Sequence, residues 1–240
     1  MPLHHVDVVN LLQSKIKGGH MNLLIFGDSW ARGVDIEESK GEFSYGQLIA
    51  WNLGLEIIKA ARPASCAENC IQQLESTNKH LFNPISKATA LFTLTSPSRH
   101  QYWNQMHEEW LEIQINSSDP NSKAWYAYLS SQKQDHHRMQ ITILALQRMC
   151  EQLGIKDRYV FGLEPFECTY PGIDKTKIYK QGKTSLTQII GILPEDASVR
   201  EFCHMTPNEY TISKDNFHPN GAGHKLIADT LIPWLREFND

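Results

Sequence analysis

The sequence has no apolar run of the length that a membrane-spanning helix needs, which is about 20 residues. Its first residues, MPLHHVD, also lack the basic stretch followed by an apolar segment that marks a secretory signal peptide. We therefore expect no membrane span and a cytoplasmic location.

Cysteine is scarce as well, and the pattern of metal ligands is missing. The five cysteines are an odd number, and their spacing matches neither a disulfide framework nor a zinc site. Asp215, His218 and His224 form no ligand set of recognisable geometry, so we expect no metal. A phosphate loop ending at Gly182-Lys183-Thr184 would need glycine at position 177, where the chain has lysine.

An excess of basic residues is also absent. The chain has 23 lysines and arginines against 27 aspartates and glutamates, and its formal net charge is -4. Proteins that bind nucleic acids usually carry a basic face, so this balance argues against a nucleic-acid partner. The charge balance leaves the oligomeric state open.

The chain does contain enough apolar residues for one sizeable hydrophobic core. It has 240 residues, 41% of them hydrophobic, which predicts a single domain over 1–240. Helical spacing of Val6, Val9, Leu12 and Ile16 predicts an N-terminal helical extension within 1–20. Strands are predicted at 21–28, 55–61, 88–95 and 159–163, and helices at 44–53, 67–81 and 220–238.

Two regions are harder to interpret. We expect 100–153 to be mostly helical, with a turn near 117–122, and its Asp135-His136-His137 to be a solvent-exposed helix start. We expect 166–213 to hold loops, a short helix and a short fifth strand. The alternation of strands and helices predicts a parallel sheet covered on both faces, with ligands beyond the carboxyl ends of its strands.

The most informative stretch is LLIFGDSWARG, residues 23–33, in which an apolar run ends abruptly in Gly-Asp-Ser. It is either a strand that runs into a polar loop or a serine nucleophile, Ser29, presented at the strand's carboxyl end. A serine needs a histidine base that is held by a carboxylate. SKDNFHPNGAGHKL, residues 213–226, supplies Asp215 and His218 before the last predicted helix.

These two blocks together resemble those of the SGNH (GDSL) hydrolase superfamily. The resemblance implies a flavodoxin-like, three-layer α/β/α fold with a parallel sheet of about five strands, and ester hydrolysis through an acyl-serine intermediate. Carried over by position, Ser29 is the nucleophile and donates its backbone N–H to the oxyanion, His218 is the base, and Asp215 orients it. The resemblance implies no cofactor.

Two further family blocks are altered here. The second block normally supplies an oxyanion donor from a glycine, whereas this chain has AARPASCAENC, residues 60–70. Ala64, Ser65 or Cys66 would have to fill that role, and we favour Ser65. The third block normally ends in an asparagine, whereas this chain has TSPSR, residues 95–99. The stretch is similar to that of divergent, often phage-encoded, members, and a phage-encoded protein would be virion-associated.

Several side chains are candidates for the missing third donor and for contact with the substrate. Ser96, Asn69 or Arg99 would replace the asparagine. Asp28, Trp30 and Arg99 are candidate substrate-contacting residues, although Asp28 is expected to shape the turn rather than to react. Removing an oxyanion donor costs about 10²- to 10³-fold in rate in other enzymes, so the altered blocks bear on activity more than on fold.

The sequence thus predicts a serine esterase (EC 3.1) that acts on a small-molecule or glycan ester, such as a carbohydrate O-acetyl group, a short acyl ester or a lipid. The alternative is a catalytically weak or inactive SGNH-like domain with a binding or structural role, for example in a phage particle.

Overall fold

The computed structural model describes residues 21–63, 65–80, 88–104, 109–113, 119–194 and 205–237. The predicted N-terminal helix within 1–20 lies outside these residues. The strands are β1 (Asn22–Phe26), β2 (Glu56–Lys59), β3 (Ala88–Leu94), β4 (His100–Asn104), β5 (Glu109–Ile113), β6 (Lys156–Phe161), β7 (Thr211–Ser213) and β8 (Asn216–Pro219).

The α-helices are α2 (Ser29–Arg32), α3 (Tyr45–Leu53), α4 (Asn69–His80), α5 (Pro120–Tyr128), α6 (Gln132–Leu153), α7 (Leu186–Ile189) and α8 (Gly221–Arg236). Three short 3₁₀ helices are η1 (Glu38–Lys40), η3 (Lys175–Lys177) and η4 (Tyr179–Gly182). Among the helices that the structure describes, none is long and apolar enough to cross a lipid bilayer.

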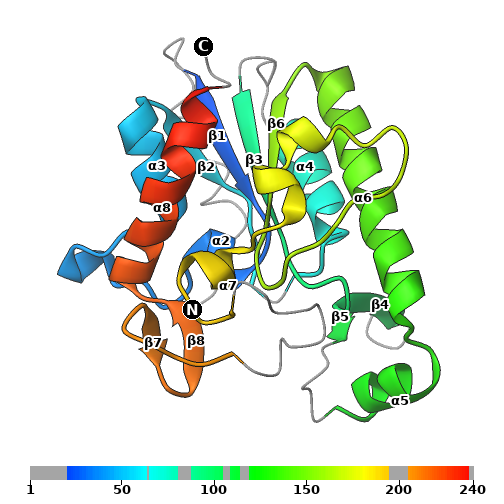
Figure 1. Ribbon diagram of the computed structural model, residues 1–240. Helices are drawn as coiled ribbons and strands as arrows, with labels where there is room; N and C mark the ends of the chain where they lie inside the picture. Colours follow the sequence, from blue (N-terminus) through cyan, green and yellow to red (C-terminus); the bar gives the residue numbers. More distant parts are fainter. Residues whose placement is uncertain are drawn as a thin grey trace.

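A parallel sheet of four strands, in the order β2-β1-β3-β6, forms the centre of the molecule. Helices α3 and α8 cover one face of this sheet, and α4 and α6 cover the other (Figure 1). Neighbouring residues of β1 alternate between the two cores: Leu24 and Phe26 pack on the α4–α6 side, and Leu23 and Ile25 on the α3–α8 side. The predicted three-layer α/β/α fold is confirmed.

The sheet has four strands where the sequence predicted about five. The segment after β6 makes only isolated parallel bridges to it, from Ile178 to Tyr159 and from Ser185 to Phe161. Between these bridges Lys180 and Gln181 have left-handed backbone angles, with φ of 44° and 55°. Left-handed residues interrupt an extended chain, and this prevents the segment from becoming a fifth strand.

The prediction that 100–153 is mostly helical is correct for α5 and α6 and wrong for 100–104 and 109–113. These two segments form the antiparallel pair β4–β5, in which Trp103 lies opposite Trp110. Aromatic residues favour strands, and the pairing partner lies outside the window that a helical pattern examines.

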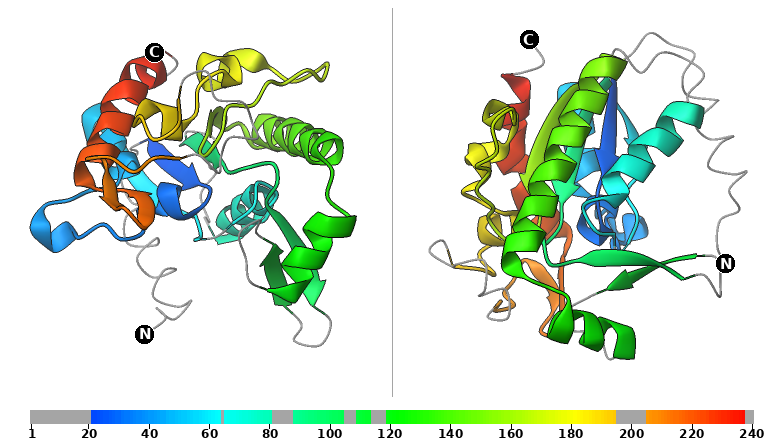
Figure 2. Two further views of the ribbon diagram at one scale, coloured as in Figure 1. Left: turned by 60° about the horizontal axis from the view of Figure 1, so that its bottom comes forward. Right: turned by 90° about the vertical axis from the view of Figure 1, so that its right-hand side faces the viewer.

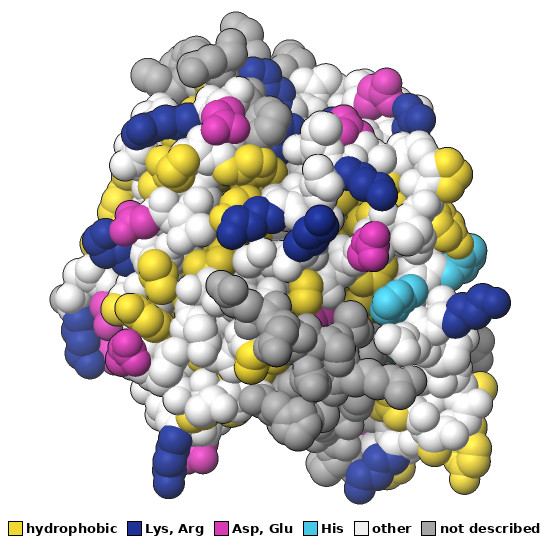
Figure 3. All heavy atoms as spheres, in the orientation of Figure 1, with side chains coloured by type: hydrophobic (Ala, Val, Ile, Leu, Met, Phe, Trp, Pro, Cys, Tyr) yellow, Lys and Arg dark blue, Asp and Glu magenta, His cyan; other side chains and the backbone are white. Residues whose placement is uncertain are grey.

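The carboxyl ends of β1 and β3 lie between two small substructures. Figure 2 (left) shows the β7–β8 hairpin and the segment of η1 on one side, and β4–β5 with α5 on the other. On the face in Figure 3, basic and acidic side chains are interspersed with small apolar groups, in keeping with the modest net charge of -4. The candidate site lies at these strand ends.

Candidate active site

The turn after β1 presents Ser29 at the start of α2. Gly27 has a φ of 135°, and a Cβ at this position would lie 2.5 Å from the carbonyl oxygen of Thr93, so the turn requires glycine. The carboxylate of Asp28 caps α2 by accepting the N–H of Trp30 at 3.0 Å. Ser29 follows directly and is 8% exposed. A sharp strand-to-helix turn therefore fixes the serine at the carboxyl edge of the sheet.

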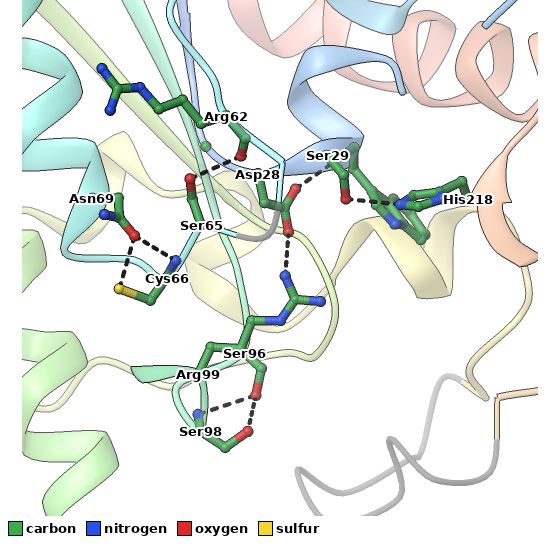
Figure 4. A network of polar contacts seen from close by, with 12 residues as sticks. Asp28, Ser29, Arg62, Ser65, Cys66, Asn69, Ser96, Ser98, Arg99 and His218 are labelled. Atoms are coloured by element: carbon green, nitrogen blue, oxygen red, sulfur yellow. Dashed lines mark hydrogen bonds and ion pairs between the residues drawn. The ribbon is translucent and has the colours of Figure 1, made fainter. Parts of the chain in front are cut away.

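His218 of β8 lies against this serine. Its Nε2 atom is 2.9 Å from Oγ of Ser29, although 189 positions separate the two residues (Figure 4). Asn220 caps α8 through a hydrogen bond from the N–H of Gly223 to its side-chain oxygen at 3.0 Å, which ends β8 and starts the last helix. The contact between Ser29 and His218 has the geometry of a nucleophile and its general base.

The other ring nitrogen of His218 faces Asp35 and Asn216. Nδ1 lies 3.1 Å from Oδ2 of Asp35 and 2.9 Å from Oδ1 of Asn216. Asp35 comes from the loop after α2, and Nδ2 of Asn216 donates to its Oδ2 at 3.0 Å. The sequence interpretation did not include Asp35, because no motif or spacing links it to His218.

The structure does not bring Asp215 to His218. Asp215 is exposed in the β7–β8 turn, and its backbone N–H donates to Oγ of Ser213 at 3.2 Å. Side chains two positions apart point to the same side of a strand, so β8 places Asn216 beside His218, whereas Asp215 lies in the turn that precedes the strand. Asp35, instead of Asp215, is the carboxylate at Nδ1.

Several polar groups of the altered second block already have partners within the protein. The N–H of Cys66 donates to Oδ1 of Asn69 at 2.8 Å, and Nδ2 of Asn69 donates to Oε1 of Gln101 at 2.8 Å. Both polar atoms of the Asn69 side chain are therefore engaged within the protein. Ser65 is buried, and its hydroxyl donates to the carbonyl of Arg62 at 2.9 Å. Ala64 lies outside the described residues.

The altered third block places a guanidinium beside the nucleophile turn. Oγ of Ser96 donates to the carboxyl of Glu164 at 2.7 Å, which commits this hydroxyl to a partner away from Ser29. Burial raises the pKa of Glu164 to about 7. Nη1 of Arg99 lies 3.5 Å from Oδ2 of Asp28, and the Arg99 side chain is 20% exposed (Figure 4). Of the three candidate replacements for the asparagine, only Arg99 points toward this turn.

A buried glutamine and a partly buried arginine that the sequence interpretation missed hold these loops. Gln73 of α4 accepts the N–H of Gly27 at 2.9 Å and donates to its carbonyl at 3.0 Å. Arg138 of α6 donates to the carbonyls of Pro97 at 2.8 Å and Arg99 at 3.0 Å. The available signal was a polar side chain on the apolar face of a helix, because such a residue needs a hydrogen-bonding partner.

Three other expectations can be compared with the structure. Trp30, a candidate for substrate contact, is buried in the core between the sheet and α8. Asp135 is buried, with a carboxylate oxygen 2.9 Å from Nε2 of His100, so its interpretation as a solvent-exposed helix start is wrong. Within the described ranges, no group of three or more His, Cys, Asp or Glu residues could hold a metal ion.

A separate cavity is lined by η4, α7, the residues between them and one residue of α8. Its volume is about 360 Å³, and its lining residues are Lys180, Lys183, Thr184, Gln188, Ile189 and Thr230. Because this lining includes neither Ser29 nor His218, we assign the chemistry to the strand ends and not to this cavity.

The chain is similar to a known protein family. The model for the GDSL-like lipase/acylhydrolase family matches residues 23–231. A search of curated protein sequences finds no match.

Several solved structures align with most of this chain. A member of the lipolytic protein G-D-S-L family from Veillonella parvula is 12% identical with a TM-score of 0.45, over 89% of this chain and 97% of that one. The esterase EstA from Pseudoalteromonas sp. is 11% identical with a TM-score of 0.46, over 91% and 98%. The acetyl xylan esterase Est2A from Butyrivibrio proteoclasticus is 14% identical with a TM-score of 0.47, over 92% and 64%.

Proposed function

The chain belongs to the GDSL-like lipase/acylhydrolase family, and we propose that it hydrolyses an ester through an acyl-serine intermediate on Ser29. The observation that carries this proposal is the 2.9 Å contact between Nε2 of His218 and Oγ of Ser29. A serine hydroxyl becomes a useful nucleophile only when a base at hydrogen-bonding distance removes its proton.

In the first half of the reaction, Oγ of Ser29 attacks the ester carbonyl carbon while Nε2 of His218 takes the hydroxyl proton. The carbonyl π electrons move onto oxygen. When the tetrahedral intermediate collapses, the bond to the alkoxy group breaks, and His218 returns the proton to the departing alcohol. The acyl group is then bound to Ser29.

In the second half, His218 takes a proton from water, and the resulting hydroxide attacks the acyl carbon. The second tetrahedral intermediate expels Oγ of Ser29, which recovers its proton from His218. An acid and an alcohol leave. Every proton and electron pair is supplied by these two residues, the ester and water, so the proposal calls for no metal or cofactor.

The negative oxygen of each intermediate needs donors that are already in place. We assign this role to the backbone N–H groups of Ser29 and Ser65, with the guanidinium of Arg99 in place of the family's asparagine. Arg99 has five N–H donors, and its described contact with Asp28 occupies one nitrogen, so the group is able to serve both.

The substrate we propose is a small-molecule or glycan ester: a carbohydrate O-acetyl group, a short acyl ester or a lipid. The alternative is a catalytically weak or inactive domain with a binding role. It is favoured by a specific observation, the engagement of both Ser96 and Asn69 in contacts within the protein, which leaves the asparagine's position to an arginine.

Labelling with a fluorophosphonate, which reacts with an activated serine, distinguishes the ester hydrolase from the binding domain. We expect the wild-type protein to be labelled, Ser29→Ala to lose the label and His218→Ala to label much more slowly. Ser213→Ala, which changes an exposed serine of β7, serves as the matched control and should label normally. Absence of label on the folded wild-type protein would overturn the enzymatic proposal in favour of the binding domain.

A further inference from the structure

We propose that Asp35, and not Asp215, is the carboxylate that positions His218 and stabilises its cationic form during the reaction. The inference rests on the proposed function and identifies a positioning residue for it. Its first basis is distance, since Oδ2 of Asp35 lies 3.1 Å from Nδ1 of His218. With Nε2 directed at Ser29, Nδ1 is the nitrogen that must carry a proton.

Asn216 fixes the Asp35 carboxylate in this place. Its Oδ1 accepts the backbone N–H of His218 at 3.0 Å, and its Nδ2 donates to Oδ2 of Asp35 at 3.0 Å. The first contact requires the amide oxygen of Asn216 and the second requires its amide nitrogen. Together they fix the orientation of this side-chain amide. The same carboxylate oxygen therefore faces two N–H donors, one from the amide and one from the imidazole.

Asn216 cannot replace the carboxylate in its electrostatic role, although its Oδ1 lies 2.9 Å from Nδ1. An amide oxygen is neutral, and it helps to select the tautomer by accepting a hydrogen bond. When His218 takes the serine proton it becomes a cation, and only a negative group gains a full charge–charge interaction with it. Asp35 is the carboxylate that the described contacts place at this nitrogen.

The loop that carries Asp35 is tied to the nucleophile itself. The backbone N–H groups of Gly33 and Val34 both donate to the carbonyl of Ser29 at 3.0 Å. Asp35 follows with a left-handed φ of 69°, a conformation that aspartate adopts more readily than most residues. The hydroxyl, the imidazole and the carboxylate are thus held by one hydrogen-bonded unit built from α2, its following loop and β8.

Exposure sets the size of the expected effect. The Asp35 side chain is 42% exposed, so water screens its charge. A buried carboxylate in the equivalent role is worth about 10⁴-fold in kcat elsewhere. For a partly solvated pair in contact we expect roughly a 10- to 100-fold loss of kcat when the charge is removed.

The experiment compares Asp35→Asn with Asp215→Asn, because both remove one charge from an exposed aspartate without changing its size. Hydrolysis of a p-nitrophenyl ester gives kcat and KM, and thermal unfolding checks that both variants fold. We expect Asp35→Asn to lower kcat about 10- to 100-fold with little change in KM. Asp215→Asn should stay within about twofold of wild type.

A second readout does not depend on turnover. A proton held between Nδ1 of His218 and a carboxylate gives a low-field signal in the proton NMR spectrum. This signal should disappear or move in Asp35→Asn and stay in place in Asp215→Asn. The reverse pattern in either readout, or an unchanged signal and kcat in Asp35→Asn, would overturn the inference. A wild-type protein that shows the signal but no activity would count against the proposed function alone.

Discussion

Replacing Gln73 by methionine would test whether the buried amide on α4 holds the turn that presents Ser29. Gln73 is 1% exposed, and its amide binds both the N–H and the carbonyl of Gly27. Methionine has a similar length and no hydrogen-bonding amide. The substitution therefore removes these contacts with little change in packed volume.

The magnitude depends on which groups are left without a partner. The carbonyl of Gly27 also accepts the N–H of Arg62 at 3.0 Å, so it remains satisfied in the variant. The N–H of Gly27 has Gln73 as its described partner and would become a buried donor without an acceptor. Such a group costs about 1–3 kcal/mol, and for a chain of this size each kcal/mol lowers Tm by about 2–4 °C.

Calorimetry or circular dichroism would measure this loss, and p-nitrophenyl ester hydrolysis would show whether Ser29 is displaced as well. We expect Gln73→Met to lower Tm by about 2–12 °C and to lower kcat. Gln132→Met, on the exposed start of α6, is the matched control and should change neither. If Gln73→Met behaved like that control, the amide would not be what holds the turn.

Two further substitutions follow from buried groups near the site. Burial lowers the pKa of His224 to about 3, so the unfolded chain binds a proton that the folded chain excludes, and stability should fall as pH decreases below about 6.5. Urea titrations at pH 7 and pH 5 should differ by about 2 kcal/mol more in wild type than in His224→Asn, and equal differences would contradict this. Gly27→Ala should abolish fluorophosphonate labelling and cost roughly 1–3 kcal/mol, because its Cβ would meet the Thr93 carbonyl; normal labelling would show that the turn adapts.

The layers of the fold could be predicted because local patterns determine them. The apolar run ending at Phe26, and the similar run ending at Leu94, are what a central parallel strand needs on both faces. The β4–β5 pair could not be recognised in the same way, because the register of an antiparallel pair, in which Trp103 lies opposite Trp110, is set between two strands and not within either one. A short stretch of consecutive residues does not reveal which strands pair with each other.

In the candidate site, too, the residues that lie in local sequence blocks could be predicted, and the residue that only the tertiary structure brings in could not. Ser29 and His218 were found because each lies in a recognisable block, and their contact depends only on where the blocks sit at the sheet edge. The partner of Nδ1 depends instead on which way each side chain of β8 points. Asp215 lies in the turn before β8, and the left-handed residue Asp35 reaches the position from a loop 181 positions before Asn216.

The proposed replacement of the third-block asparagine by Arg99 would have an electrostatic consequence for the whole turn. Asp28 is 1% exposed and stands next to Ser29, where the proposed acyl transfer would develop a negative oxygen. Two like charges in a poorly hydrated site repel each other, so an uncompensated Asp28 would raise the barrier. The N–H of Trp30 at 3.0 Å and the guanidinium of Arg99 at 3.5 Å both offset that charge. A neutral asparagine would supply a donor without this compensation, and we propose that Arg99 supplies both.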